Sequence, residues 1–208
     1  MHSAQIKTIE FFAIFIATPI SFAFGYPVWL KLSVGVLGFA YVVFVLLKVE
    51  KERFRLSKSI NWKRFWKETA VTFLLIAGIS VIYVWATNRD ALFDVMLNKP
   101  SLWLLLLFIY CVFSVYPQEV LYRTFFFKRY EPFFSSKWMA IFTNALVFSL
   151  GHLFFKNPLV LFITFVGGLL FAHSFYKTQS TLLVSIQHAI YGSWLFTVGM
   201  GGILGFPV

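Results

Sequence analysis

Residues 101–116 read SLWLLLLFIYCVFSVY, sixteen consecutive positions without a charged side chain. The whole chain has the same character, because 60% of its 208 residues are hydrophobic and only 12% are charged. Soluble domains carry about a quarter charged residues, so this composition cannot build a surface that faces water. A membrane-spanning helix needs about 20 apolar residues. We therefore predict an all-α fold, a polytopic transmembrane helix bundle of about seven spans.

The apolar runs set the bounds of the predicted spans. They cover residues 9–24, 28–49, 69–87, 101–129, 137–155, 158–176 and 180–204. Pro117 interrupts the fourth run, and we expect it to kink or partly unwind the helix there. No repeat or second domain is visible, so residues 1–208 are predicted to form a single integral membrane domain.

The charge balance is strongly basic, with a formal net charge of +10. Residues 48–68 alone hold eight Lys and Arg against three Glu, with aromatic residues between them. This mixture predicts an amphipathic segment on an anionic lipid leaflet, or equally a solvated loop. Hydropathy makes membrane topology a better explanation of the charge than nucleic acid, which we do not expect as a partner.

The distribution of basic residues predicts the orientation of the chain. A cytoplasmic N-terminus places thirteen Lys and Arg in cytoplasmic segments and four in the opposite loops, which fits the positive-inside rule. We expect a multi-pass protein of the bacterial plasma membrane. The single cysteine, Cys111, is interpreted as a small buried hydrophobic residue.

Polar side chains at bilayer depth are costly and often functional. Within the predicted spans we single out Gln118, Glu119, Arg123, Asn144, His152, His173 and His188. Both aspartates of the chain, Asp90 and Asp94, fall in one loop, which excludes the paired carboxylates of an aspartyl protease. The chain also lacks the H-E-x-x-H zinc motif and the G-x-S-x-G serine elbow.

The remaining carboxylate and imidazoles suit the activation of water. Glu119 and Arg123 are four residues apart, so they share a helix face and can pair. A carboxylate and an imidazole can act on water as general bases, and a second imidazole can donate to the oxyanion that forms. The alternatives are a purely structural ion pair, a divalent metal held by Glu119, His152 and His188, or a proton relay in a transporter.

The order of these residues resembles the CPBP family of CAAX proteases and bacteriocin-processing enzymes. Its three motifs are E-E-x-x-x-R, F-x-x-x-H and H-x-x-x-N, and the corresponding residues here are Gln118-Glu119-x-x-x-Arg123, Phe148-x-x-x-His152 and His188. The resemblance covers residues 101–205, whereas residues 1–100, with three spans, match only in being hydrophobic.

The resemblance implies an intramembrane endopeptidase of the glutamic type, acting on a peptide or protein at the membrane without a metal or other cofactor. It implies that His152 activates water and that His188 stabilises the oxyanion. Glu119 would match the second Glu of the family motif, which pairs with the Arg, here Arg123.

Two positions depart from the family pattern. Gln118 stands in place of the first Glu, and Gly192 in place of the Asn that follows His188 by four residues. Since Gln cannot accept a proton at neutral pH, the alternative is a non-catalytic relative that binds a partner or acts in immunity. A kink at Pro117 could instead turn Glu119 toward His152 as the base, with Gln118 as an oxyanion donor. His173 or Asn144 could then replace the missing Asn.

Overall fold

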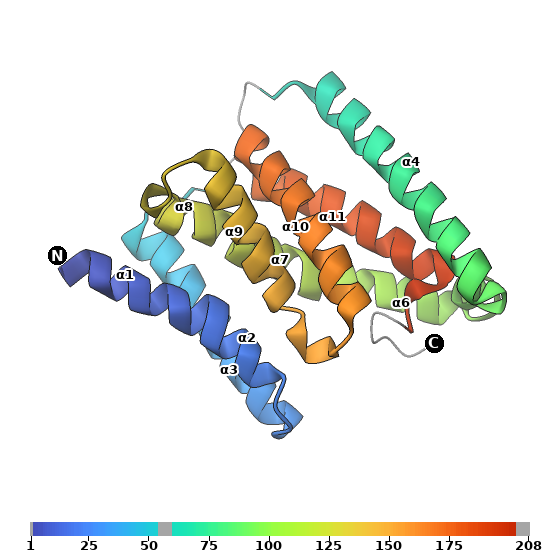
Figure 1. Cartoon of the computed structure of the whole chain (residues 1–208), viewed down its shortest axis with the longest axis horizontal. Coiled ribbons are helices and arrows are strands. Elements are labelled where there is room, and N and C mark those ends of the chain that lie inside the picture. The colour runs from blue at the N-terminus through green and yellow to red at the C-terminus, as the bar shows by residue number, and fades with distance from the viewer. Residues whose placement is uncertain (1, 54–59, 203–208) are drawn as a thin grey trace. The chain divides into compact units, whose positions relative to one another are not determined.

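The computed structural model describes residues 2–53 and 60–202, and these contain helices and connecting turns without a β-strand. Six of the described helices are long and apolar enough to cross a membrane (Figure 1). They are Ala4–Phe22, Val28–Val49, Trp62–Thr87, Pro100–Phe133, Lys137–Phe155 and Pro158–Thr178. The prediction of an all-α, multi-pass bundle is confirmed.

The seventh predicted span is helical but is not one of these six. It comprises α11 (Thr181–Leu195) and a π-helical continuation, η8 (Phe196–Met200). Its polar side chains find partners on a neighbouring helix, since Gln187 Nε2 donates to Thr69 Oγ1 at 2.7 Å. A helix whose polar face packs against protein needs less apolar surface than one that faces lipid, which explains its lower hydropathy.

The chain divides into two compact units, which we describe separately. Unit 1 comprises Met1–Arg55 and Pro117–Lys177, and unit 2 comprises Leu56–Tyr116 and Thr178–Val208. The boundary between them lies inside the long helix Pro100–Phe133, between Tyr116 and Pro117.

Unit 1 begins with a helical hairpin. Its elements are α1 (His2–Phe12), the π-helical η1 (Ala13–Ala17), α2 (Thr18–Phe22), α3 (Val28–Phe44) and the π-helical η2 (Val45–Val49). Residues 25–27, the gap between the first two predicted spans, separate α2 from α3 (Figure 1). Lys31 Nζ donates to the Phe22 carbonyl oxygen at 2.6 Å and so caps the end of α2.

The second half of unit 1 carries α9 (Lys137–Leu150), the short 3₁₀ turn η7 (Leu153–Phe155) and α10 (Pro158–Thr178). Lys156 turns the chain with a φ of 52°, and Asn157 Oδ1 accepts from the Leu159 amide at 2.9 Å. A Cβ at Gly168 would lie 2.9 Å from Ala145 Cα. The backbones of α9 and α10 therefore approach as closely as a small residue permits.

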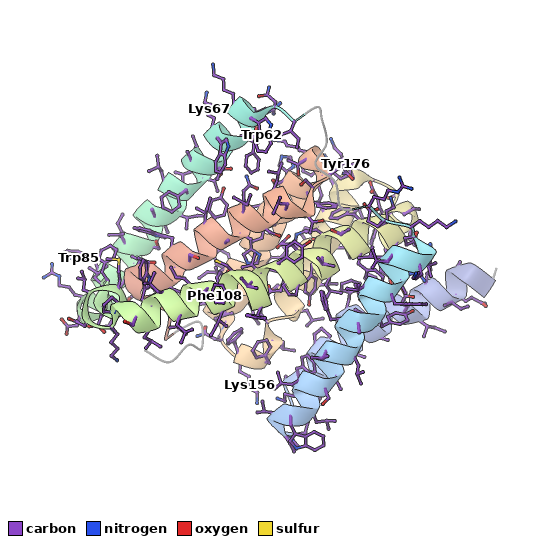
Figure 2. All side chains as sticks on the ribbon, turned by 180° about the vertical axis from the view of Figure 1, so that it is seen from behind. Trp62, Lys67, Trp85, Phe108, Lys156 and Tyr176 are labelled. Atoms are coloured by element: carbon purple, nitrogen blue, oxygen red, sulfur yellow. The ribbon has the colours of Figure 1, made fainter. Side chains whose placement is uncertain are left out.

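Unit 2 consists of the 26-residue helix α4 and the shorter elements around α11. They are α4 (Trp62–Thr87), the 3₁₀ turn η3 (Arg89–Ala91), α5 (Asp94–Asn98), α6 (Pro100–Ile109) and the π-helical η4 (Tyr110–Val115), with α11 and η8. Trp62 and Trp85 lie near opposite ends of α4 (Figure 2), as expected for aromatic anchors at the two membrane interfaces.

The helix α4 begins earlier than the predicted span 69–87. Asn61 Oδ1 accepts from the Arg64 amide at 3.0 Å and caps the helix, which therefore starts at Trp62. The last seven residues of the basic stretch 48–68 thus belong to α4, while residues 54–59 lie outside the described part of the chain.

The long helix is not unwound at Pro117. It continues from η4 through α7 (Tyr116–Glu119), the π-helical η5 (Val120–Phe125) and α8 (Phe126–Tyr130) into the 3₁₀ turn η6 (Glu131–Phe133). Tyr116 and Glu119 both have right-handed helical backbone angles. Proline lacks an N–H and cannot continue the α-helical ladder, and here wider π turns on both sides accommodate the break.

Candidate active site

The Glu119–Arg123 pair lies at the centre of unit 1. Arg123 Nε is 3.2 Å from Glu119 Oε2, and both side chains are fully buried. The predicted i,i+4 contact is therefore present. Because a buried charge without a partner is strongly destabilising, each residue makes it possible to keep the other inside the bundle. Gln118, next to Glu119, is only half-buried.

Asn144 on α9 completes the support of Arg123. Arg123 Nη1 donates to Asn144 Oδ1 at 2.5 Å, and Asn144 Nδ2 in turn donates to the Tyr122 carbonyl oxygen. This carbonyl belongs to the π turn η5, where the α-helical hydrogen-bond ladder is interrupted. Both ends of the Asn144 amide thus contact the Arg123 segment, and its role as a replacement oxyanion donor stays a prediction.

His152 follows α9 and is oriented by the backbone of the last turn of that helix. Its Nδ1 lies 2.8 Å from the Phe148 carbonyl oxygen. Since a carbonyl oxygen can only accept, this contact assigns the proton to Nδ1 and leaves Nε2 as the basic nitrogen of the neutral ring. The imidazole also meets the Phe148 ring edge-on, with 4.9 Å between centroids.

Phe148 connects His152 to the buried ion pair. The Arg123 guanidinium lies over the Phe148 ring, 4.5 Å from its centroid, and His152 packs against the same ring. Such cation–π contacts gain strength when desolvated, and Phe148 is only 1% exposed. The F-x-x-x-H spacing therefore places an aromatic side chain between an arginine and an imidazole. We call Glu119, Arg123, Asn144, Phe148 and His152 the carboxylate cluster.

His188 belongs to unit 2, on α11, so its meeting with the carboxylate cluster stays a prediction. Its ring packs edge-to-face against Tyr110, with 6.0 Å between centroids. Gly192, one helical turn further on, lies against the same tyrosine, because a Cβ at Gly192 would be 1.9 Å from Tyr110 Oη. We call His188, Tyr110 and Gly192 the histidine–tyrosine cluster.

His173 stacks on Trp138, with ring centroids 5.7 Å apart and planes inclined by 10°. This contact places the imidazole beside a largely exposed tryptophan. The stacking gives His173 a packing role of its own, distinct from the contacts of the carboxylate cluster.

The described residues contain no group of three or more His, Cys, Asp or Glu side chains arranged to hold a metal ion. The expectation of metal-independent hydrolysis stays a prediction that metal analysis of the purified protein would test.

The family model of the type II CAAX prenyl endopeptidase Rce1-like proteins matches residues 100–206, just over half of the chain. The chain belongs to this Rce1-like family. The match confirms the resemblance seen in the three motifs. It identifies a multi-pass membrane protein of a protease family, whose substrates are peptides or proteins at the membrane. No curated protein and no solved structure matches the chain.

Two tyrosines of this Rce1-like chain were not predicted as site residues. Tyr110 packs against His188 and Gly192, and Tyr122 packs against Gly151, the neighbour of His152, where a Cβ would be 2.2 Å from Tyr122 Oη. Each of these glycines is close to a motif histidine in sequence. A glycine at such a position is a signal that a large side chain from another helix fills the space beside it.

Proposed function

We propose that this protein is an intramembrane endopeptidase that hydrolyses a peptide bond of a membrane-associated substrate. The observation that carries the proposal is the arrangement of His152. Its backbone contact leaves Nε2 as the basic nitrogen, and Phe148 joins its ring to the buried Glu119–Arg123 pair. A basic imidazole beside a buried ion pair suits the activation of water.

In the proposed reaction, water attacks the carbonyl carbon of the substrate. The oxygen–carbon bond forms, the water proton passes to Nε2 of His152, and the carbonyl π electrons move onto the oxygen. The carboxylate of Glu119 compensates the positive charge of the imidazolium, and Arg123 holds that carboxylate in place. His188 donates to the oxyanion. When the intermediate collapses, the carbon–nitrogen bond breaks and the leaving amine takes the proton from His152.

The test compares two histidine variants in proteoliposomes. His152→Asn keeps an N–H that can donate to the Phe148 carbonyl but removes the basic nitrogen, so cleavage should fall by ~10²- to 10⁴-fold. His173→Asn makes the same change at the ring that stacks on Trp138, and it should keep wild-type activity. Lipid-anchored peptides with and without a prenylated cysteine serve as substrates, and cleavage is detected by mass spectrometry. Equal cleavage by wild type and His152→Asn would contradict the proposal.

A second candidate function is the binding of a partner without catalysis. The half-buried Gln118 favours it, because an amide stands where the family has a carboxylate. On this alternative, wild type does not cleave any of the peptides, and Glu119→Ala retains the cellular phenotype of the wild type. The variant Gln118→Glu separates the two functions. Cleavage by that variant but not by wild type would show that the wild-type site is inactive because Gln118 replaces the carboxylate of the family motif.

We also propose that the protein lies in a bacterial plasma membrane with its N-terminus in the cytoplasm. The basic side chains described within the 48–68 stretch are exposed, as expected for residues that face anionic headgroups. Protease protection of the basic stretch, after reconstitution of the protein into nanodiscs that differ only in anionic lipid content, would test the lipid contact.

A further inference from the structure

The side chain of Tyr110 occupies the space that a residue larger than glycine would need at position 192. A Cβ built on Gly192 would lie 1.9 Å from Tyr110 Oη, 2.5 Å from Cζ and 2.7 Å from Cε1. Real Cβ atoms do not approach other heavy atoms so closely, so any larger residue at position 192 would require the Tyr110 ring to move. In this structure the polar side chain of Tyr110 fills the space where the family motif has its asparagine.

Tyr110 is held firmly beside His188. Its ring meets the His188 ring edge-on, with 6.0 Å between centroids, and meets Phe196 edge-on at 4.7 Å. Only 9% of the residue is exposed. The tyrosine begins the π turn η4, and such turns often occur at functional sites. Its hydroxyl thus has a fixed position one helical turn along α11 from His188.

We propose that the Tyr110 hydroxyl is the second oxyanion donor of this enzyme, acting together with His188 in place of an asparagine. The proposal rests on the proposed peptidase function. A phenol is protonated at neutral pH and donates one hydrogen bond, and tyrosine hydroxyls are among the groups that form oxyanion holes. The carbonyl oxygen that receives the electron pair would accept from both groups, and it loses that pair again when the carbon–nitrogen bond breaks.

The hydroxyl of Tyr110 is the group that lies nearest to Gly192, where the resemblance predicts a donor. The aromatic contacts with His188 and Phe196 are made by the ring, and phenylalanine would preserve them. Replacement by phenylalanine therefore tests the hydroxyl while keeping these ring contacts.

The first experiment removes only the hydroxyl. Tyr110→Phe should lower kcat for the cleaved peptide by ~10²- to 10³-fold, as for the loss of one oxyanion donor, with little change in KM and Tm. The control is Tyr116→Phe, the same change on the same long helix at a side chain that is 41% exposed, and it should leave kcat unchanged. A phosphonate analogue of the tetrahedral intermediate should bind more weakly to Tyr110→Phe, while an uncleaved ground-state peptide should bind as before.

The second experiment exchanges the donors. Gly192→Asn alone should lose activity and stability, because its side chain collides with Tyr110. The double variant Tyr110→Ala/Gly192→Asn opens that space and should recover a substantial part of the activity that Tyr110→Ala loses. A double variant no better than Tyr110→Ala, together with a fully active Tyr110→Phe, would overturn the assignment of Tyr110.

The outcomes separate this inference from the function on which it rests. If wild type cleaves, His152→Asn does not and Tyr110→Phe is unimpaired, the peptidase function stands and the role of Tyr110 is wrong. If wild type and His152→Asn are indistinguishable, the peptidase function fails and the oxyanion role fails with it. A Tyr110→Phe variant that loses kcat but keeps its Tm and its ground-state binding supports both.

Discussion

Arg123 makes three different contacts that a lysine cannot reproduce together. Its Nε faces Glu119, its Nη1 donates to Asn144 and its plane covers Phe148. A lysine carries one compact ammonium group and lacks the planar fork. We predict that Arg123→Lys destabilises the protein by about 1–3 kcal/mol, the cost of leaving a buried hydrogen-bond partner unsatisfied, and that it lowers cleavage.

The matched control for Arg123→Lys is Arg64→Lys. Arg64 also pairs with a glutamate four residues later, at 2.8 Å, but both side chains of that pair are substantially exposed. Exposed pairs contribute about 1 kcal/mol or less, so Arg64→Lys should leave unfolding almost unchanged. Denaturant titration in detergent measures both variants, and equal shifts would show that burial of the Glu119–Arg123 pair has no energetic consequence.

At the residue scale, the spacing of residues in the sequence predicted the ion pair and the motif histidines. It did not predict which side chains from other helices contact them. The Glu119–Arg123 contact follows from a four-residue separation, which is local. The contacts of Tyr110, Phe148 and Asn144 depend on which side of each helix faces another helix. Each π turn adds a residue to the helix and shifts all later side chains by about 100°. The π turns η4 and η5 lie on either side of α7. The period of a regular helix therefore does not predict which way the side chains on this helix point.

At the scale of elements, a second buried ionic network joins the N-terminal hairpin to the long helix within unit 1. Arg129 on α8 donates to Glu10 on α1 through Nε and Nη2, and to Glu50 Oε1 through Nη1 at 2.6 Å. Glu10 also accepts from the hydroxyls of Tyr130 and Tyr41. This network is not evident in the sequence, because Glu10 lies at the very start of an apolar run and Arg129 at the end of another.

We predict that Arg129→Ala is strongly destabilising, by about 3–5 kcal/mol, because it leaves Glu10 buried without its main counter-charge. The adjacent Lys128 offers a control, since its ion pair with Glu52 at 2.8 Å is partly exposed. Lys128→Ala should cost about 1 kcal/mol or less. Thermal unfolding of the two variants in the same detergent gives the comparison, and a Tm equal to wild type in Arg129→Ala would refute the role of the network.

The contact of α9 with α10 gives a further prediction for an element pair. Gly168→Ala would force a methyl group against the Ala145 backbone and should destabilise the protein by about 1–3 kcal/mol. Gly78→Ala on α4 adds a methyl group in open space and should be neutral or stabilise by about 1 kcal/mol. Thermal unfolding again distinguishes them. Destabilisation of similar size in both variants would point to a general intolerance of alanine instead of a close helix contact.

At the scale of the whole molecule, composition sufficed to predict the class of fold. Few charged residues and long apolar runs allow only a helical membrane bundle. The start of α4 was harder to predict. The helix begins after the Asn61 cap with basic and aromatic residues, which do not resemble the apolar sequence of a membrane span. The polar face of α11 shows the same limit of hydropathy, since its partners on α4 become visible only in three dimensions.

The proposed orientation predicts a specific labelling pattern. In a Cys111→Ala background, Lys156→Cys places a thiol at the exposed turn before α10 (Figure 2), and Lys128→Cys places one at the exposed end of α8. A membrane-impermeant maleimide should label position 156 in intact cells and position 128 only after permeabilisation. The reverse pattern would place the N-terminus outside the cell.

The fit between Tyr110 and Gly192 also restricts the order in which these two positions can change. A chain of this fold can first lose the tyrosine and later gain a side chain at position 192, passing through an intermediate with a small void. The opposite order passes through a steric collision, since the incoming atom has no room while the phenol remains. In homologues, the residues at positions 110 and 192 should therefore vary as a pair. The residue at position 192 alone is then not enough to decide whether a homologue is active, because the residue at position 110 can supply the missing donor.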